Sequence, residues 1–257
     1  MINELRKDPL LGRWVAVLSD SKPPSEYNHP PENSGETSCV LCPGHESETP
    51  LEIAAIRDGN KWWTRVIPEF KPVFQVEGDL GRKGVGMYDK MNSIGANEII
   101  IESPEHNKPP EDIGIEQVLR VIRMYRGRVA DLERDPRLRY ILIFKNYGKG
   151  AGAAYTHPYS EVVATPIIPK RMKEELDGAK QYYSYKERCI FCDMMREEMR
   201  LGDRVVFETK DFIAFSIFAP KFPFEFWIVP KRHVCAFQDI SDSEMEDLSV
   251  MLSTMVK

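Results

Sequence analysis

The sequence predicts a mixed protein of helices and strands that is built as two similar halves, the second of them incomplete. Segments with strand composition and segments with helical spacing follow one another along the chain. Each half opens with a C-x-x-C motif and later contains an apolar strand that runs from a Glu to a Pro and a His before a helix. We expect the first half at residues 1–169, a charged linker at 170–187 and the partial second half at 188–257.

The first elements of the chain are predicted from local composition. Residues 18–38 are rich in Pro, Ser, Asn and Glu and predict an exposed loop, and the four glycines in residues 78–86 predict another. Residues 62–67 and 97–102 have strand composition. Three consecutive isoleucines at 99–101 indicate that the second of these strands is buried on both faces.

The rest of the first half contains one long helix and two more strands. Apolar residues at helical spacing predict a helix over residues 115–134. Residues 140–144 and 162–164 have strand composition, and a glycine-rich loop at 148–152 separates them.

The second half repeats the order of motifs seen in the first. Its opening motif, CIFC at 189–192, corresponds to CVLC at 39–42. His233 follows Glu225 at the same distance, eight residues (233 − 225), as His106 follows Glu98 (106 − 98). The shared order predicts an internal duplication.

The last segment of the chain predicts a helix that begins with a capping box. Ser241 and Glu244 have the spacing in which a hydroxyl and a carboxylate each accept a backbone N–H. The strands that follow the corresponding helix in the first half have no counterpart before Lys257. We therefore expect this chain to be a truncated product or a fragment.

The overall composition excludes several classes of function. The chain has 35 Lys and Arg against 40 Asp and Glu, a net charge of −5, with both signs scattered, so nucleic acid is not an expected partner. It has no run of about 18 apolar residues and no amino-terminal signal peptide, so we expect no contact with a membrane and a cytoplasmic location. In such a reducing compartment, paired cysteines are more often metal ligands or redox centres than disulfides.

Four residues of the first half have the chemistry of a zinc site. Zinc prefers four tetrahedral ligands drawn from thiolate and imidazole, and a C-x-x-C turn supplies two of them. Two histidines that we expect at strand ends would complete the set, which is Cys39, Cys42, His106 and His157. The other interpretations are that some of these are unrelated buried residues, or that His45 is a ligand.

The second half repeats three of these ligands. Cys189, Cys192 and His233 predict a second, weaker metal site. By analogy with the interval from His106 to His157, its fourth ligand would lie beyond Lys257.

Six further segments span nearly the whole chain: LRKDPLLGRWV (5–15), RVIP (65–68), ESPEH (102–106), FKN (144–146), PFE (223–225) and VPKRH (229–233). In sequence and in order they resemble segments of the galactose-1-phosphate uridylyltransferase family and of the related ADP-glucose phosphorylases. The resemblance implies an α+β fold of two histidine-triad-like halves, each an antiparallel sheet with packed helices. It also implies the first zinc site, a homodimer, and a nucleotide sugar or sugar phosphate as ligand.

The sequence departs from this family where the chemistry takes place. The family motif H-P-H-x-Q or H-S-H-x-Q supplies a zinc ligand, a nucleophilic histidine and a phosphate-binding glutamine, whereas this chain reads HPYSE at 157–161. Tyr159 holds the nucleophile position and Glu161 the glutamine position. Ala154 and Glu69 replace a family Ser and Asn, and two family arginines are missing from residues 18–23. The candidate phosphate contacts that remain are Asn146, Lys149, Gly150 and Gly152.

Three functional hypotheses follow. The chain could carry out nucleotidyl transfer between a nucleotide sugar and a sugar 1-phosphate, as the resemblance implies for galactose metabolism. It could be a zinc-organised relative that binds a nucleotide or a protein partner without transfer. It could also perform a different phosphate chemistry with Tyr159 as the nucleophile.

Overall fold

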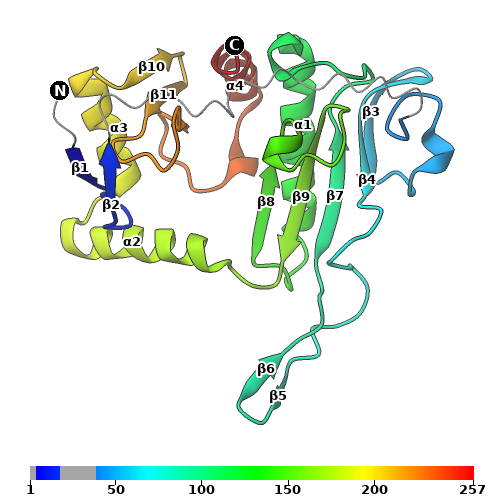
Figure 1. Ribbon diagram of the computed structural model, residues 1–257, viewed down its shortest axis with the longest axis horizontal. Coiled ribbons are helices and arrows are strands. Elements are labelled where there is room, and N and C mark those ends of the chain that lie inside the picture. The colour runs from blue at the N-terminus through cyan, green and yellow to red at the C-terminus, as the bar shows by residue number, and fades with distance from the viewer. Residues whose placement is uncertain (1–3, 18–38) are drawn as a thin grey trace. The chain divides into compact units, whose positions relative to one another are not determined.

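The computed structural model describes residues 4–17 and 39–257 (Figure 1). The loop predicted at 18–38, including the positions of the two missing arginines, lies outside the described residues. The chain forms two compact units. One consists of Pro31–Ile168 with Ala236–Met245 and Val256–Lys257, and the other of Met1–Pro30 with Pro169–Cys235 and Glu246–Met255.

A five-stranded antiparallel sheet organises the first of these units. Its order is β3-β4-β7-β9-β8, visible as adjacent ribbons in Figure 1. The strands are β3 (Ala54–Asp58), β4 (Lys61–Pro68), β7 (Ala96–Ile101), β9 (Tyr159–Thr165) and β8 (Tyr140–Phe144). Four of them confirm predicted strands, and the side chains of the isoleucine run in β7 are fully buried.

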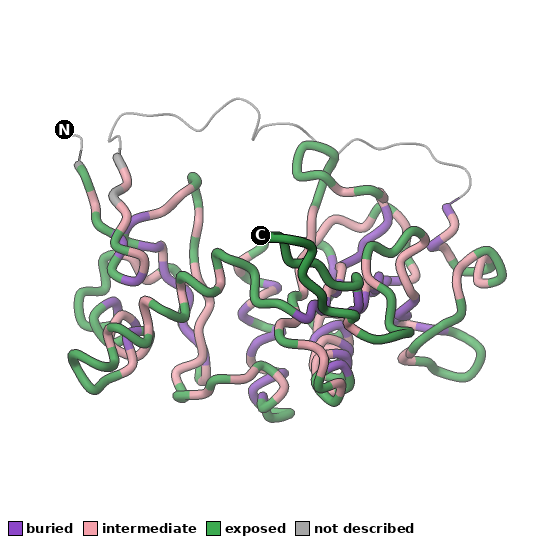
Figure 2. Tube along the Cα trace, turned by 90° about the horizontal axis from the view of Figure 1, so that it is seen from below, coloured by how far each residue is buried: buried purple, intermediate pink, exposed green. Residues whose placement is uncertain are grey.

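The two faces of this sheet are buried by different parts of the chain. Helix α1 (Ile115–Leu132), which confirms the predicted helix, packs against one face through residues such as Met124. The other face is covered by the segment around Cys39 and Leu41, which packs on Trp62, Ile67, Ile99, Ile101 and Tyr159. Buried residues, purple in Figure 2, fall largely on the strands and helices, and exposed residues fall largely on the connections.

Short elements connect the strands of this unit. The glycine-rich stretch predicted as a loop, residues 78–86, instead includes the strand β5 (Lys83–Val85). This strand forms a hairpin with β6 (Tyr88–Lys90), in which Gly86 makes the turn with a φ of 61°. The 3-10 helices are η2 (Glu46–Glu48), η3 (Pro110–Asp112), η4 (Lys149–Ala151) and η5 (Phe237–Asp239).

The other unit contains a hairpin, two helices and a three-stranded antiparallel sheet. The hairpin is β1 (Glu4–Lys7) with β2 (Trp14–Val17), and the sheet is β10 (Val205–Glu208), β11 (Phe212–Ser216) and β12 (Phe226–Pro230). The helices are α2 (Lys170–Lys186) and α3 (Ile190–Leu201). Together the two units give the α+β class, with antiparallel sheets, that the sequence predicts.

Helix α2 occupies the residues predicted as a linker. Its charged composition suits a helix, because Lys170 pairs with Glu174 and Arg171 with Glu175 at the i,i+4 spacing. The boundaries of the two predicted halves remain a prediction.

The final helix, α4 (Asp242–Met255), begins as its sequence predicts. The Glu244 carboxylate accepts the Ser241 backbone N–H at 2.8 Å, and the Ser241 hydroxyl accepts the Glu244 N–H at 3.2 Å. The capping box is therefore confirmed.

Candidate functional site

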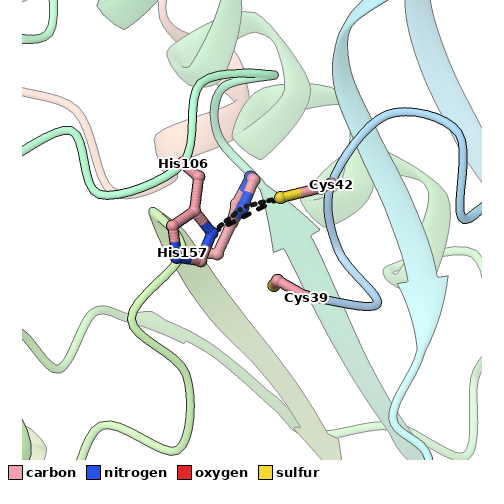
Figure 3. A group of neighbouring side chains, drawn as sticks. All are labelled: Cys39, Cys42, His106 and His157. Carbon is pink, nitrogen blue, oxygen red and sulfur yellow. Dashed lines mark hydrogen bonds between the residues drawn. The ribbon is translucent and has the colours of Figure 1, made fainter. Parts of the chain in front are cut away.

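Four predicted metal ligands of the first half come together at the end of the five-stranded sheet (Figure 3). Cys39 and Cys42 lie in a tight turn in which the Cys42 N–H donates to the Cys39 carbonyl at 3.0 Å. His106 lies five residues beyond the end of β7. The prediction that His157 ends a strand is wrong, because it lies two residues before the start of β9. Since β7 and β9 are antiparallel, the end of one lies beside the start of the other, and the two histidines still meet.

The distances between the donor atoms match a tetrahedral metal site. His106 Nδ1 lies 3.3 Å from His157 Nδ1, and Cys42 Sγ lies 3.4 and 3.6 Å from these two nitrogens. With Zn–N bonds of about 2.0–2.1 Å and Zn–S bonds of about 2.3 Å, the edges of a tetrahedron are about 3.3 Å between nitrogens and about 3.5 Å from sulfur to nitrogen. Together with Cys39, all four donor atoms lie within 4.8 Å of one another. The residues therefore fit a zinc ion in both chemistry and spacing.

The surroundings of His157 hold it in the form that binds a metal. Its Nε2 donates to the Ser103 carbonyl at 2.7 Å, which leaves the lone pair on Nδ1 directed at the other ligands. Burial lowers the pKa of His157 to about 4, although the hydrogen bond to Ser103 acts in the opposite direction. The imidazole is therefore neutral at neutral pH, as a ligand must be.

The two cysteine thiols, unlike the neutral imidazole, must lose a proton before they can bind a metal ion. Burial, and after it the neighbouring Cys39, raise the pKa of Cys42 to about 11. A thiol in this environment becomes a thiolate only beside a cation, because a bound metal ion inverts the local electrostatics. His45 does not join the group: its Nδ1 donates to Glu48 Oε1 at 2.8 Å.

Tyr159 is a packed core residue at the position predicted for the nucleophile. Only 2% of its surface is exposed, and its ring meets the ring of Tyr155 edge-on at 5.3 Å. Its phenol oxygen accepts the backbone N–H of Ala154 at 2.8 Å. Burial raises the pKa of Tyr159, and this hydrogen bond offsets only part of the increase. A phenol of this kind is a poor nucleophile.

Two carboxylates accompany Tyr159 on the same side of the sheet. Burial raises the pKa of Glu161, and the charge of Glu69 raises it further. The pKa of Tyr155 rises to about 12, first through burial and then through Glu69. In the region predicted to contact phosphate, burial and the neighbouring carboxylates therefore disfavour an additional negative charge.

The glycine-rich loop turns tightly beside Tyr159. Gly148 and Gly152 have φ values of 79° and 87°, which favour glycine. The Gly152 N–H donates to the Lys149 carbonyl at 3.0 Å, so this amide is already used within the loop. Lys149 and Gly150 are exposed and Asn146 is half-buried. These three remain predicted phosphate contacts.

A buried polar network that local sequence patterns do not predict supports the site from the side of α1. Glu102, 4% exposed, accepts from Tyr125 at 2.8 Å and from Lys145 at 2.5 Å, and it also accepts from the Ser160 hydroxyl. Lys145 donates in addition to the Tyr159 carbonyl at 3.1 Å. The network fixes the residue before Ser103, whose carbonyl orients His157.

The predicted ligands of the second half also come together. Cys192 Sγ lies 3.1 Å from His233 Nδ1, and with Cys189 the three donor atoms lie within 4.8 Å of one another. Cys189 is the residue that precedes α3, and Cys192 lies in the first turn of that helix. Both cysteines are half-buried and His233 is exposed. Three side chains that could hold a metal ion are thus in place.

Within 4–17 and 39–257, no helix combines the length and apolar character needed to cross a membrane.

Comparison with known families gives two matches that together cover most of the chain. Residues 1–169 match the model of the galactose-1-phosphate uridyl transferase N-terminal domain, and residues 175–257 match that of the C-terminal domain.

Comparison with individual proteins gives the same result. The chain is 30% identical to ADP-glucose phosphorylase from Arabidopsis thaliana, over 99% of this chain and 73% of that protein. It is 29% identical to galactose-1-phosphate uridylyltransferase from Thermotoga maritima, over 98% of this chain and 74% of that protein. Among solved structures, the Arabidopsis ADP-glucose phosphorylase with bound ADP-glucose matches with a TM-score of 0.82 at 30% identity, covering 99% of this chain and 76% of that one. A structure described as a uridylyltransferase matches with a TM-score of 0.73 at 25% identity, covering 98% of this chain and 73% of that one.

Proposed function

Because this chain belongs to the galactose-1-phosphate uridylyltransferase family, we propose that it is a zinc-organised member that binds a nucleotide sugar or a sugar phosphate without covalent transfer through residue 159. The observation that carries the proposal is the contrast within one site. Three of the four candidate metal ligands have the spacing of a tetrahedral site and the fourth, Cys39, lies within 4.8 Å of them, whereas the nucleophile position holds a buried phenol.

The four donor side chains, and the carbonyl group that orients one of them, support a zinc ion at this site. Cys39, Cys42, His106 and His157 would hold it, and the Ser103 carbonyl fixes one imidazole in the correct tautomer. Bound there, zinc would supply structural cross-linking rather than reaction chemistry, because four protein ligands leave it no open position.

The lack of covalent transfer is supported by the environment of Tyr159. Imidazole both attacks and leaves readily, whereas a phenol with an unperturbed pKa of about 10 needs a base to attack. Here burial raises the pKa of Tyr159 further, and its oxygen is occupied by the Ala154 N–H. Glu161 and Glu69 would also repel the developing charge that transfer requires the site to stabilise.

The ligand class is supported by the relatives and by the glycine-rich loop. The Arabidopsis relative was solved with ADP-glucose bound, and its chain aligns with nearly all of this one. In this chain Asn146, Lys149 and Gly150 would contact the phosphates, mainly through the loop backbone.

The remaining parts of the proposal concern the whole protein. Cys189, Cys192 and His233 would form a second, weaker metal site. The family resemblance supports a homodimer, and the free thiols of both C-x-x-C pairs suit a reducing compartment such as the cytoplasm.

The test measures binding and covalent modification separately. We expect calorimetry to show saturable binding of UDP-glucose or ADP-glucose, and intact-protein mass spectrometry to show no UMP or AMP adduct. Tyr159→His alone should restore little adduct, since Glu161 still opposes the phosphate. Tyr159→His with Glu161→Gln should restore more than the sum of the single changes, because both groups act on one transition state.

Tyr155→His is the matched control, because Tyr155 is the aromatic neighbour of Tyr159 and does not hold the nucleophile position. It should form no adduct, alone or with Glu161→Gln. A nucleotide adduct mapped to Tyr159 in the unmodified protein would instead establish the phenol as a nucleophile and refute the proposal.

A further inference from the structure

The carboxylate of Glu46 joins the cysteine turn to the central sheet. Glu46 is the first residue of η2, directly after the turn. Its Oε1 accepts the indole N–H of Trp62 at 2.7 Å, and its Oε2 accepts the backbone N–H of Gly44 at 2.9 Å. Gly44 is two residues beyond Cys42, and Trp62 lies on β4. The Glu46 side chain therefore connects the segment that contains Cys42 to this strand.

Trp62 supports the same turn by packing. It is 4% exposed and belongs to the buried cluster that contains Cys39 and Leu41. Gly44 adopts a φ of 93°, a left-handed conformation that lets the chain bend back toward Glu46 directly after the ligand. The chain is thus held to β4 on both sides of Cys42.

A second set of hydrogen bonds attaches the other end of this segment, residues 49–52, to β4. Arg65 on β4, 2% exposed, donates from Nε to Glu52 Oε2 at 2.7 Å and from Nη2 to Thr49 Oγ1 at 3.2 Å. Its guanidinium also lies 5.6 Å from the centre of the Trp62 ring. The segment that carries η2 is therefore attached to β4 at both of its ends.

The two histidine ligands adjoin strands of the same sheet as β4. Strand β7 hydrogen-bonds to β4, and β9 hydrogen-bonds to β7. Arg65 pairs with Ile101 of β7, and Ile101 pairs with Tyr159 of β9. His106 follows β7 and His157 precedes β9, so strand pairing sets their separation. The cysteines lie outside any strand, and their position depends on side-chain ties to β4.

We propose that Glu46 is a positioning residue for the metal centre: by bridging Gly44 and Trp62, it places the Cys42 thiolate at bonding distance from a metal held by His106 and His157. The inference rests on the proposed function, in which these residues bind zinc. Outer groups that orient metal ligands typically account for about 10- to 100-fold in metal affinity. Glu46 would act in this way on the thiolate side, as the Ser103 carbonyl does on His157.

The protonation state of Glu46 agrees with this role. Burial acts to raise its pKa, but the hydrogen bond from Trp62, together with backbone N–H groups, lowers it overall. The group is therefore an ionised carboxylate, and its two hydrogen bonds are charge-assisted.

The first test compares two isosteric changes in the same short helix. Glu46→Gln replaces one accepting oxygen by an NH₂ group, so one of the two N–H donors loses its acceptor. We expect zinc affinity, measured by competition with a chromogenic chelator, to fall by about 10- to 100-fold. Glu48→Gln removes the same charge two residues away, where the exposed carboxylate pairs with His45 and, within 4–17 and 39–257, with no other side chain. It should change affinity by less than about twofold.

The second test separates positioning from general stability. Trp62→Phe removes the indole donor and keeps an aromatic ring, and its effect on zinc affinity should not add to that of Glu46→Gln, because both break one bridge. The matched control is Trp63→Phe, on a residue whose ring contacts Arg120 instead. With Co²⁺ as a probe, the two bridge variants should show a weaker thiolate-to-cobalt absorption band, and the control should not.

The outcomes are distinct. If Glu46→Gln and Glu48→Gln bind zinc equally well, or if the bridge variants lower only the melting temperature of the metal-free protein, Glu46 does not position the ligand. If Glu46→Gln does not fold, Trp62→Phe decides the question by the same measurements. If the unmodified protein binds neither zinc nor Co²⁺, the proposed function itself fails, and the variants then have no affinity to compare.

Discussion

The two cysteine–histidine clusters start from the same motif and differ in the backbone that carries it. In the first, the C-x-x-C motif forms a turn, and the residue before its second cysteine, Leu41, is completely buried. In the second, the motif begins helix α3, and the matching residue, Phe191, is 42% exposed. A helical first turn directs consecutive side chains around the helix axis, whereas the tight turn places Leu41 on the sheet.

This difference separates a candidate metal site that is part of a core from one that lies at the surface. The first cluster shares its apolar surroundings with the central strands, and two of its four ligands are buried. The second has one exposed and two half-buried ligands. The spacing of cysteines therefore predicts that a metal can bind, and the burial of the intervening residues indicates how strongly binding is coupled to folding.

The largest expected difference is in stability after loss of a cysteine. Cys39→Ser should abolish zinc binding at the first cluster and lower stability by at least about 5 kcal/mol, because structural zinc contributes directly to folding. Cys189→Ser should lower it by about 1 kcal/mol or less, since its cluster is more exposed. Zinc content by elemental analysis and denaturant unfolding would measure both. A metal-free Cys39→Ser protein with unchanged stability would show that the first cluster is not structural.

A smaller difference is expected for the residues inside the motifs. Leu41→Ala should cost about 2–5 kcal/mol, because it leaves a cavity under the turn. Phe191→Ala should cost about 1 kcal/mol, because Phe191 loses mainly its contact with Trp227 at 6.2 Å between ring centres. Urea unfolding of the two variants gives the comparison directly, and equal costs would mean that the two motifs are equally integrated into their units.

The clusters should also differ in how fast they release metal. Four protein side chains could enclose an ion in the first cluster, whereas three are in place in the second. We expect a chelator to remove metal from the second cluster at least about tenfold faster, and the second cluster to be only partly occupied after purification. Following zinc release with a colorimetric chelator in Cys39→Ser and Cys189→Ser assigns each phase. A single release rate in the unmodified protein would contradict this prediction.

The smallest expected effect is on the pH dependence of stability. It has opposite signs for two acidic residues, one near each cluster. Burial raises the pKa of Glu161, so the stability linked to its protonated form is fully present below the unfolded pKa of about 4.3 and is lost as the pH rises through the folded pKa. Glu161→Gln should therefore stabilise the protein at pH 7 by a few tenths of a kcal/mol, about what solvent screening allows, and have no effect near about pH 4.

Asp193, beside Cys192, provides the opposite case. A hydrogen bond from Tyr182, and then the charge of Arg188, lower its pKa. Its contribution to stability is present above the unfolded pKa and is lost as the pH falls through the folded pKa. Asp193→Asn should slightly lower the melting temperature at pH 7 and have progressively less effect in acid. Melting curves across this pH range would show whether the two variants shift in opposite directions.

The sequence predicted the parts of the fold that depend on local pattern. The isoleucine run of β7, the helical spacing of α1 and the capping box at Ser241 all follow from side-chain periodicity or a local hydrogen bond, and the structure confirms each. The two ligand clusters were predicted from residue chemistry and spacing, and their members do come together.

The rest depends on contacts between distant residues, which spacing does not encode. The Glu46–Trp62 bridge spans 16 residues, and the Glu102 network joins Lys145, which directly follows β8, with residues of β9 and α1. The place of His157 before β9 followed from strand pairing, and the composition of α2 resembled that of a solvated linker. In each case a contact with a residue distant in the sequence determined the local structure.

The order of the ligands along the chain also affects how the protein is made. Cys39 and His157 are separated by 118 residues (157 − 39), and the strands that bring them together include the last one of the sheet to be synthesised. At about 5–20 residues per second, a ribosome needs roughly 6–24 s to complete this interval. During that time the nascent chain carries a pair of thiols whose last predicted partner, His157, does not yet exist. Oxidation of this pair in the nascent chain would therefore compete with correct folding, and the supply of reductant and zinc during translation would set the yield of native protein.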